Sequence, residues 1–191
     1  FQQQTLYVDK TPPSIEITGV TNNSANKGDV IPVITYFDTN YDDSQVTITL
    51  TGANRNGVPI EGSFTNIANG KRFTFQNFEK VKEMDDIYTL TVTLTDRAGN
   101  SSTETINFSV NRFASNYLLS DSVKALNGTY RMSADDLIVS EVNADRLSDI
   151  VITLYKNEQT ITLTEGEDYI IEIEGGDGGW YVYNYTIFKK N

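Results

Sequence analysis

The sequence predicts an all-β protein built from two tandem antiparallel β-sandwich modules. Three observations predict this class: apolar and polar residues alternate along much of the chain, the polar partner is repeatedly threonine, and turn-forming glycine and asparagine recur at short intervals. Alternation with period two places one set of side chains on a core and the other in water. Threonine suits a pleated, half-buried surface better than a helix. At 191 residues, the chain is long enough for two domains that each bury a core.

The first half shows the clearest strand pattern. Tyr88 to Thr95 alternates without a break, and the run Asp96 to Asn100 after it reads as a hairpin with a bulged turn. In that turn we expect Gly99 to supply positive φ, while Asp96 and Asn100 bond to the backbone. A metal-binding rim is the alternative role for these two residues. We expect a loop or one helical turn at 79–84, and strands near 14–20, 30–38, 45–52, 58–65, 71–78, 87–95 and 103–111.

The second half repeats this chemistry with different spacing. Its predicted strands are 137–139, 150–155, 160–164, 169–173 and 180–188. We expect the boundary near 111–115, which gives a first module over 8–113 and a divergent second module over 114–191. Residues 1–7 are then a tail or the remnant of a preceding module. The second module either closes in a different way or lacks a closing hairpin.

Composition excludes several classes of function. The chain has no cysteine and no histidine, and its formal net charge is −11. Disulfides, thiolate nucleophiles, imidazole metal ligands and Ser-His-Asp chemistry are therefore excluded. An acidic surface is repelled by nucleic acid and anionic lipid, and no run approaches the ~18 apolar residues of a membrane span. Acids that are adjacent or alternate on one strand do not predict the facing pair of a glycoside hydrolase, so we expect no enzyme.

Two motifs carry a resemblance to a known family. The runs Asp9-Lys10-Thr11-Pro12-Pro13-Ser14-Ile15 and Asp96-Arg97-Ala98-Gly99-Asn100-Ser101-Ser102 lie about one domain length apart. Residues 8–113 thereby resemble bacterial immunoglobulin-like repeats of secreted or cell-wall-attached proteins, mostly from Gram-positive bacteria. The resemblance implies an immunoglobulin-like β-sandwich outside the cytoplasm that serves as a non-catalytic spacer, stalk or adhesive module. The second half is only distantly similar.

The same resemblance sets the expected partners. They are neighbouring domains of the same polypeptide and a host or cell-surface glycan or protein, and we expect a monomer. The alternative function is a carbohydrate-binding accessory module of a secreted enzyme.

One segment is a candidate calcium site. Oxygen-bearing side chains occur at alternate positions at Asp38, Asn40 and Asp42, as at the start of a calcium loop. The sixth and twelfth positions do not fit an EF-hand, which leaves a looser interstrand site or a solvated turn. Further ligands for the looser site would be Asp85, Asp86 or Asp96. No other cofactor is expected.

The densest group of aromatic residues lies near the C-terminus, at Trp180, Tyr181, Tyr183 and Tyr185. On one strand the three tyrosines share a face and Trp180 lies on the other. Exposed in a row, such rings could stack on sugars. The alternative is that one face is core and the other an edge or interdomain surface, where tyrosine buries its ring and keeps its hydroxyl wet.

Overall fold

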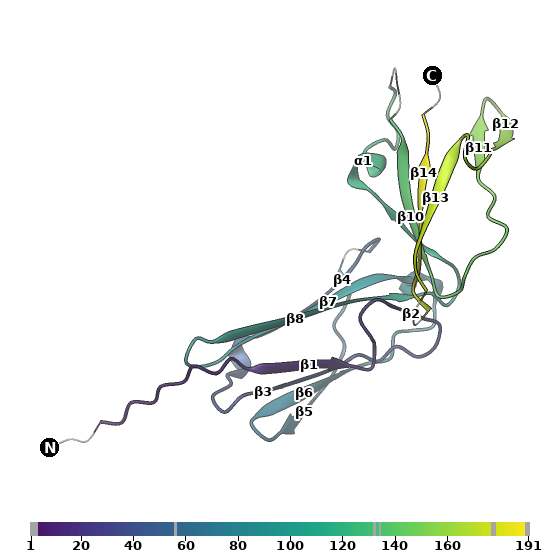
Figure 1. The fold of residues 1–191 in the computed structure, drawn as a ribbon. Coiled ribbons are helices and arrows are strands. Elements are labelled where there is room, and N and C mark those ends of the chain that lie inside the picture. Colours follow the sequence, from purple (N-terminus) through teal and green to yellow (C-terminus); the bar gives the residue numbers. More distant parts are fainter. Residues whose placement is uncertain (1–3, 56, 132, 134, 177–178, 190–191) are drawn as a thin grey trace. The chain divides into compact units, whose positions relative to one another are not determined.

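The computed structural model describes residues 4–55, 57–131, 133, 135–176 and 179–189 (Figure 1). Contacts divide the chain into two units, and each is described separately. Unit 1 comprises Phe1–Asn23, Gly28–Lys80 and Tyr88–Phe108. Unit 2 comprises Ser24–Lys27, Val81–Ile87 and Ser109–Asn191. The expected module limits, 8–113 and 114–191, stay a prediction.

The first sheet of unit 1 contains four antiparallel strands in the order β1-β3-β6-β5. They are β1 (Ser14–Thr18), β3 (Val33–Phe37), β6 (Gly70–Phe75) and β5 (Gly62–Ile67). The double proline before β1 gives it an extended start, because proline fixes φ and restricts the residue before it.

The second sheet has the order β2-β8-β7-β4. Most of β8, β7 and β4 belongs to unit 1, whereas β2 falls in unit 2. Its strands are β2 (Ser24–Asn26), β8 (Ser101–Val110), β7 (Asp86–Thr95) and β4 (Val46–Gly52). When β1 and β3 to β8 are lettered A to G in chain order, the two sheets read ABED and CFG. This is the strand order of a constant-type immunoglobulin domain, with β2 as an added strand beside G. The immunoglobulin-like β-sandwich is therefore confirmed by topology.

The core of unit 1 is explained by the alternation along β7. Its residues Tyr88, Leu90, Val92 and Leu94 are fully buried. The ring of Tyr88 stacks on that of Phe108, with centroids 5.5 Å apart. The opposite face of β7 carries threonines whose hydroxyls meet those of β8, for example Thr93 and Thr103 at 2.9 Å. The threonine positions thus lie on the outer face, as the pattern predicts.

Two expected details of unit 1 are also confirmed. β7 and β8 join through the turn at Asp96, where Gly99 adopts φ 92°. The segment 79–84 contains a single helical turn, η2 (Lys82–Met84), and another turn, η1 (Asp43–Gln45), precedes β4.

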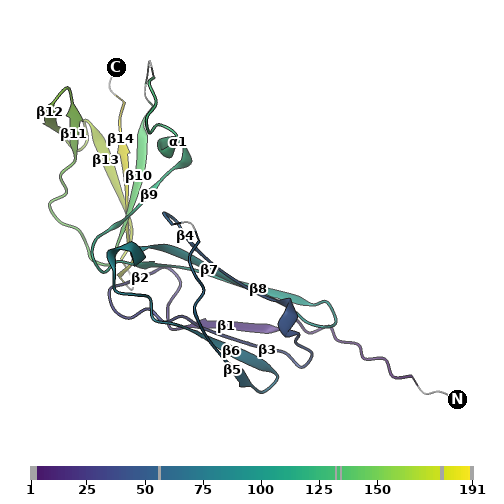
Figure 2. The same cartoon turned by 180° about the vertical axis from the view of Figure 1, so that it is seen from behind.

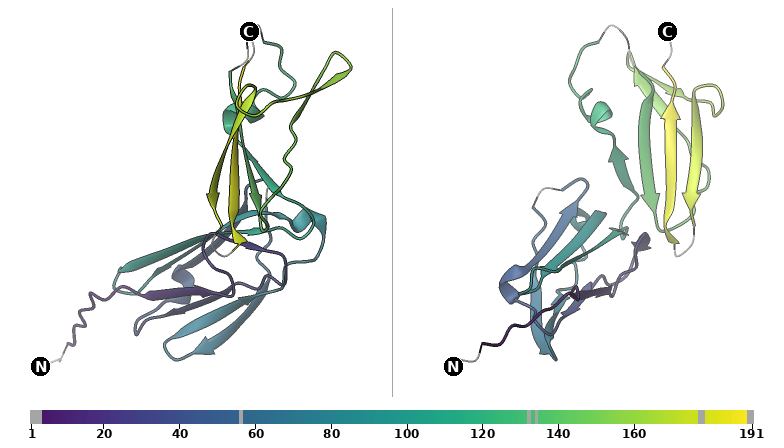
Figure 3. Two further views of the ribbon diagram at one scale, coloured as in Figure 1. Left: turned by 45° about the vertical axis from the view of Figure 1, so that its right-hand side comes forward. Right: turned by 60° about the vertical axis from the view of Figure 1, so that its left-hand side comes forward.

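Unit 2 is built on one four-stranded antiparallel sheet, ordered β13-β14-β10-β9 (Figure 3). Its strands are β9 (Asn116–Leu119), β10 (Leu137–Asn143), β13 (Tyr169–Gly175) and β14 (Tyr181–Ile187). A short helix, α1 (Asp121–Lys124), follows β9. The prediction of an all-β fold built from antiparallel sheets is confirmed.

A separate hairpin in unit 2 pairs β11 (Thr153–Lys156) with β12 (Gln159–Thr162). Its two turn residues, Asn157 and Glu158, both have positive φ, as a tight hairpin turn with right-handed twist requires.

Unit 2 covers its apolar surface sparsely. Val142, Tyr169 and Tyr183 are buried. Many other large apolar side chains are at least one-third exposed: Tyr117, Leu119, Tyr130, Ile138, Val151, Leu154, Tyr155, Ile161, Ile170 and Ile173. The exposed side chains lie both on the four-stranded sheet and on the separate hairpin. Among the residues described, no helix is long and apolar enough to cross a membrane.

Candidate functional site

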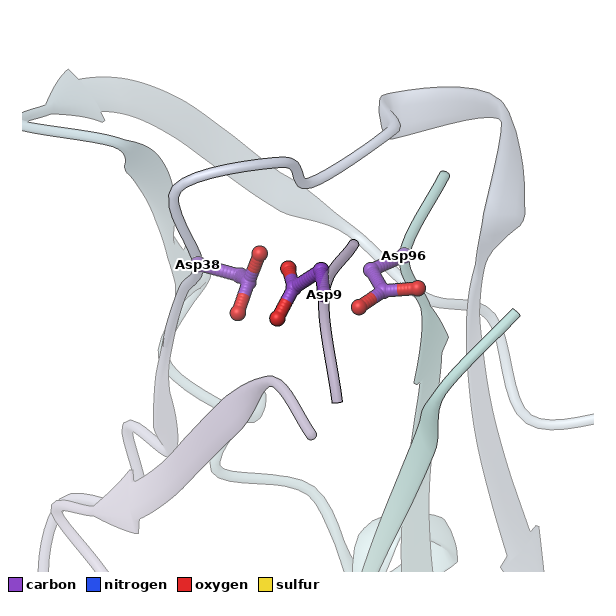
Figure 4. A group of neighbouring side chains, drawn as sticks. All are labelled: Asp9, Asp38 and Asp96. Atoms are coloured by element: carbon purple, nitrogen blue, oxygen red, sulfur yellow. The ribbon is translucent and has the colours of Figure 1, made fainter. Parts of the chain in front are cut away.

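Three carboxylates from distant parts of the sequence meet at one end of unit 1 (Figure 4). They belong to Asp9, Asp38 and Asp96, and one oxygen of each lies within 4.8 Å of the others. Figure 4 shows the side chain of Asp9 between those of Asp38 and Asp96. We call this group the carboxylate cluster.

The fold brings the cluster together from both sheets. Asp9 lies in the extended segment before β1, Asp38 directly follows β3, and Asp96 directly follows β7. Asp38 and Asp96 keep only 8% and 3% of their surface exposed. Because strand ends of both sheets meet at this end of the sandwich, residues just beyond them become neighbours.

Two asparagines tie the cluster together. The side-chain amide of Asn40 donates to Asp9 Oδ2 at 2.8 Å, and the Asn40 backbone N–H donates to Asp38 Oδ1 at 2.6 Å. The side-chain amide of Asn100 donates to Asp96 Oδ2 at 2.8 Å and to the carbonyl oxygen of Asp9 at 3.3 Å. The two motifs that carry the family resemblance therefore touch in three dimensions.

Hydrogen bonds keep two of the carboxyls acidic. The backbone N–H of Thr11 and then the side chain of Asn40 hold the pKa of Asp9 below its usual value. For Asp96, burial acts to raise the pKa, but donors from Asn100 and the backbone of Ala98 outweigh it, so the pKa is lowered. At neutral pH these groups are therefore negatively charged and suited to a cation.

The cluster fits the oxygen chemistry of calcium. Calcium binds oxygen at about 2.3–2.6 Å, so two ligand oxygens of one ion lie at most about 5 Å apart. The carboxylate separation meets this limit. Each bonded carboxylate oxygen has a second lone pair, so the hydrogen bonds above do not exclude a metal. Asp9, Asp38 and Asp96 would supply one oxygen each, with the Asn40 side chain adjacent.

The structure brings together some predicted calcium ligands and separates others. Asp38, Asn40 and Asp96 lie at the cluster. Asp42 is not a member of the cluster. Its Oδ1 accepts from the backbone N–H of Ser44 at 3.0 Å and caps η1. Asp85 and Asp86 belong to unit 2.

Asp85 Oδ2 accepts the backbone N–H groups of Arg112 and Phe113 at 2.8 and 2.7 Å. Oδ1 of the fully buried Asp86 accepts the backbone N–H of Ile87 at 2.8 Å. Both carboxylates therefore act in the backbone of unit 2 and not at the cluster.

Asp9 is the cluster residue that sequence reasoning missed as a ligand. The available signal was its position: it heads the leading motif, and Asp96 heads the trailing one. In an immunoglobulin sandwich the segment before strand A and the FG turn lie at the same end. Pairing the two motifs in space would have pointed to Asp9.

The expected row of exposed aromatic rings is corrected by the burial of two tyrosines. Tyr183 and Tyr185 keep 0% and 5% of their surface exposed and belong to the core of unit 2. The hydroxyl of Tyr183 accepts the backbone N–H of Leu147 at 2.7 Å. Trp180 and Tyr181 are half-buried. The two buried rings cannot stack on a sugar, which leaves Trp180 and Tyr181 as the aromatic surface of this strand.

A buried acid in unit 2 accepts hydrogen bonds from the hydroxyls of two tyrosines. Glu141 on β10 is 7% exposed and accepts from Tyr185 at 2.5 Å and from Tyr117 at 3.1 Å. Burial raises the pKa of both tyrosines, and the hydrogen bond to Glu141 and the charge of Glu141 raise it further. Glu141 was not singled out from the sequence, although it occupies an inward position in the alternation of β10.

Comparisons with known proteins add little. No protein-family model matches the chain, and no curated protein matches it. Among solved structures, a pair of tandem immunoglobulin domains of titin aligns with 11% identity, covering 93% of this chain and 84% of that one, at a TM-score of 0.26. The immunoglobulin-like fold of unit 1 is assigned from its strand order.

Proposed function

We propose that this chain is a non-catalytic structural or adhesive segment, a spacer or stalk, of an extracellular bacterial surface protein. The observation that carries the proposal is the position of β2, an early strand, beside β8, the last strand of the sandwich, because two such strands resist being pulled apart lengthwise. The family resemblance of the two motifs supplies the compartment. Calcium at the carboxylate cluster belongs to the same proposal.

The first two strands of the chain, β1 and β2, lie in different sheets. β1 pairs antiparallel with β3, whereas β2 lies beside β8. The backbone N–H of Asn23 donates to Asn107 O at 2.6 Å, and that of Asn111 donates to Asn26 O at 2.9 Å. Because the residue numbers rise together, β2 and β8 run in the same direction.

Parallel terminal strands load their hydrogen bonds in shear. A force that pulls the two ends of the sandwich apart acts along β2 and β8 in opposite directions. All the bonds between them must then break together, whereas a peeled hairpin loses one bond at a time. A spacer that must hold a distal domain away from a cell wall needs this geometry.

The carboxylate cluster would strengthen the same end of the sandwich. A calcium ion there would join Asp9, in the segment before β1, to Asp38 and Asp96 beyond strands of the two sheets. It would remove the mutual repulsion of three carboxylates and fix the leading segment against unit 1.

Thermal unfolding tests the calcium part. At a free calcium concentration 100 times the Kd, binding stabilises the fold by about 2.7 kcal/mol, which raises Tm by about 10 °C or more in a domain of this size. We expect the rise in wild type and in Asp42→Asn, whose carboxylate lies outside the cluster. We expect none in Asp9→Asn. An unchanged wild-type Tm at millimolar calcium would remove calcium from the proposal.

Single-molecule pulling tests the mechanical part. The chain has no cysteine, so paired cysteine handles can be placed at will. Handles at Lys10→Cys and Phe113→Cys load β1 against β3 and β2 against β8 lengthwise. Handles at Thr49→Cys and Thr103→Cys instead pull the sheet of β4, β7 and β8 apart sideways. We expect a clearly higher unfolding force for the first pair. Equal forces would contradict the spacer function.

A further inference from the structure

The segment before the carboxylate cluster has the character of a β-strand without a sheet. In Gln4–Val8 the side chains of Leu6, Tyr7 and Val8 are 87%, 86% and 73% exposed. These residue types favour strands, and three large apolar side chains in a row are rarely left in water. The segment carries no charge. It is therefore suited to pairing with an open sheet edge.

The sheet of unit 2 offers such an edge at β9. This strand ends the order β13-β14-β10-β9 (Figure 2), and its residues Asn-Tyr-Leu-Leu are uncharged. Tyr117 and Leu119, which share one face, are 50% and 39% exposed. Proteins usually protect edge strands with charged side chains. The opposite edge, β13, has this protection from the exposed Glu172 and Glu174, whereas β9 does not.

The two features complement each other in pattern and charge. In an extended Gln4–Val8 segment, Leu6 and Val8 point to one face, as Tyr117 and Leu119 do on β9. The chain has a net charge of −11, so most surfaces of two copies repel each other. Contact between two uncharged apolar strands avoids that repulsion.

We propose that residues Gln4–Val8 of one molecule add as a β-strand to the outer edge of β9 in a second molecule. Leu6 and Val8 cover Tyr117 and Leu119 on the same face. The contact joins two different surfaces of the same chain, so it is heterologous and gives either closed rings or open chains of molecules. This self-association goes beyond the spacer function, and neither proposal depends on the other. It differs from the monomer expected from the sequence.

The size of the contact sets its strength. A five-residue strand buries less than the ~1,200 Å² below which interfaces are weak and transient. We therefore expect a Kd on the order of 10⁻⁴ M, a range in which such contacts form only at high concentration. Tethering many copies to one surface would raise their effective concentration and strengthen the association.

Sedimentation velocity of the full chain from about 10 μM to 1 mM tests the association. We expect the weight-average mass of wild type to rise with concentration. The Leu6→Asp and Leu119→Lys variants should keep the mass of a monomer at every concentration. Leu119→Lys adds to β9 the kind of charge that protects other edge strands. The matched control is Ile138→Lys, which places the same charge at an exposed position on the other face of the neighbouring strand β10. It should still associate. A monomeric wild type, or association that survives both edge variants, would overturn the proposal.

Disulfide trapping tests the pairing itself in this cysteine-free chain. Leu119→Cys is mixed with Leu6→Cys, Tyr7→Cys or Val8→Cys under mild oxidation. A disulfide needs Cα atoms about 4.4–6.8 Å apart with Cβ atoms facing each other, so only the residue directly opposite Leu119 can form it readily. We expect either Leu6→Cys or Val8→Cys to form heterodimers several-fold faster than Tyr7→Cys. Equal rates would refute strand pairing. An internal disulfide in the doubly substituted Leu6→Cys/Leu119→Cys chain, without dimers, would show that the segment folds back on its own molecule.

Discussion

Replacing Tyr185 by phenylalanine should destabilise unit 2 selectively. The Tyr185 hydroxyl donates to Glu141 Oε2 at 2.5 Å, and both side chains are more than nine-tenths buried. Without the hydroxyl, one oxygen of a buried carboxylate loses its donor and cannot reach water. Removing a hydrogen bond to a charged group costs about 1.5–3 kcal/mol.

The loss of stability should differ between the two tyrosines that donate to Glu141. Tyr117→Phe removes a longer bond of 3.1 Å from a half-exposed ring, where water can replace the hydroxyl, so its cost should stay below about 1 kcal/mol. Tyr130→Phe is the matched control, because Tyr130 is fully exposed. Combining Tyr185→Phe with Glu141→Leu should recover part of the loss, since no buried carboxylate then lacks its donor.

Urea unfolding followed by tryptophan fluorescence is the assay. The chain has a single tryptophan, Trp180, which directly precedes β14, so its emission reports unit 2. With an m-value of about 1–2 kcal/mol/M, a loss of about 2 kcal/mol lowers the midpoint by about 1–2 M. A midpoint for Tyr185→Phe that matches Tyr130→Phe would refute the reasoning. If Tyr185→Phe does not fold, Tyr117→Phe and the double variant still test it.

Three further predictions address other parts of the chain. Burial, and then the charge of Asp43, raise the pKa of Tyr36 to about 12, so the folded state holds this proton more tightly than the unfolded state. Unit 1 should therefore lose stability as pH rises from about 10 towards about 12, and circular-dichroism melts of Tyr36→Phe should lack that part of the loss. Gly70→Ala would place a Cβ 2.0 Å from the Tyr36 carbonyl oxygen, so it should destabilise unit 1 by at least about 1–3 kcal/mol. Gly28→Ala, with open space around the new Cβ, should not. If Trp180 and Tyr181 bind sugars, polysaccharide in a native gel should retard wild type but not Trp180→Ala. Wild type that migrates freely with every glycan tested would rule out the carbohydrate-binding alternative.

The strands that the sequence predicts best are those in which apolar and polar residues alternate along one buried face. β7 shows a long run with one face in the core, and its expected position, 87–95, is shifted by one residue at its start. β2 and β9 were not expected, because neither has an alternating apolar pattern. β2 is a three-residue strand held beside β8 by partners such as Asn111. β9 begins at a buried asparagine whose amide donates to Val110 O at 2.8 Å. Such strands are fixed by hydrogen bonds to distant residues, which leave no periodic signal.

The carboxylate cluster was only partly predictable for a related reason. Asp38 and Asn40 are close in sequence, so their oxygens could be recognised as one pattern. Asp9 and Asp96 reach the same place only because the sandwich brings the segment before its first strand next to the turn between its last two. Local spacing carries no information about this approach, whereas the strand order of the fold does.

The inward position of Glu141 could have been predicted from the local sequence pattern. Along β10 the residues Leu137, Val139 and Glu141 share a face, so alternation alone places this acid towards the core. An acid at an inward position needs hydrogen-bond donors, because the free energy of burying a carboxylate without partners is too high for the strand to stay folded. β14 supplies Tyr185 and β9 supplies Tyr117, and the hydroxyls of both donate to Glu141. The aromatic run that looked like a sugar platform is thus better explained by the demand of one buried acid and the core around it. The same demand predicts that Glu141→Leu alone will be tolerated better than Tyr185→Phe alone.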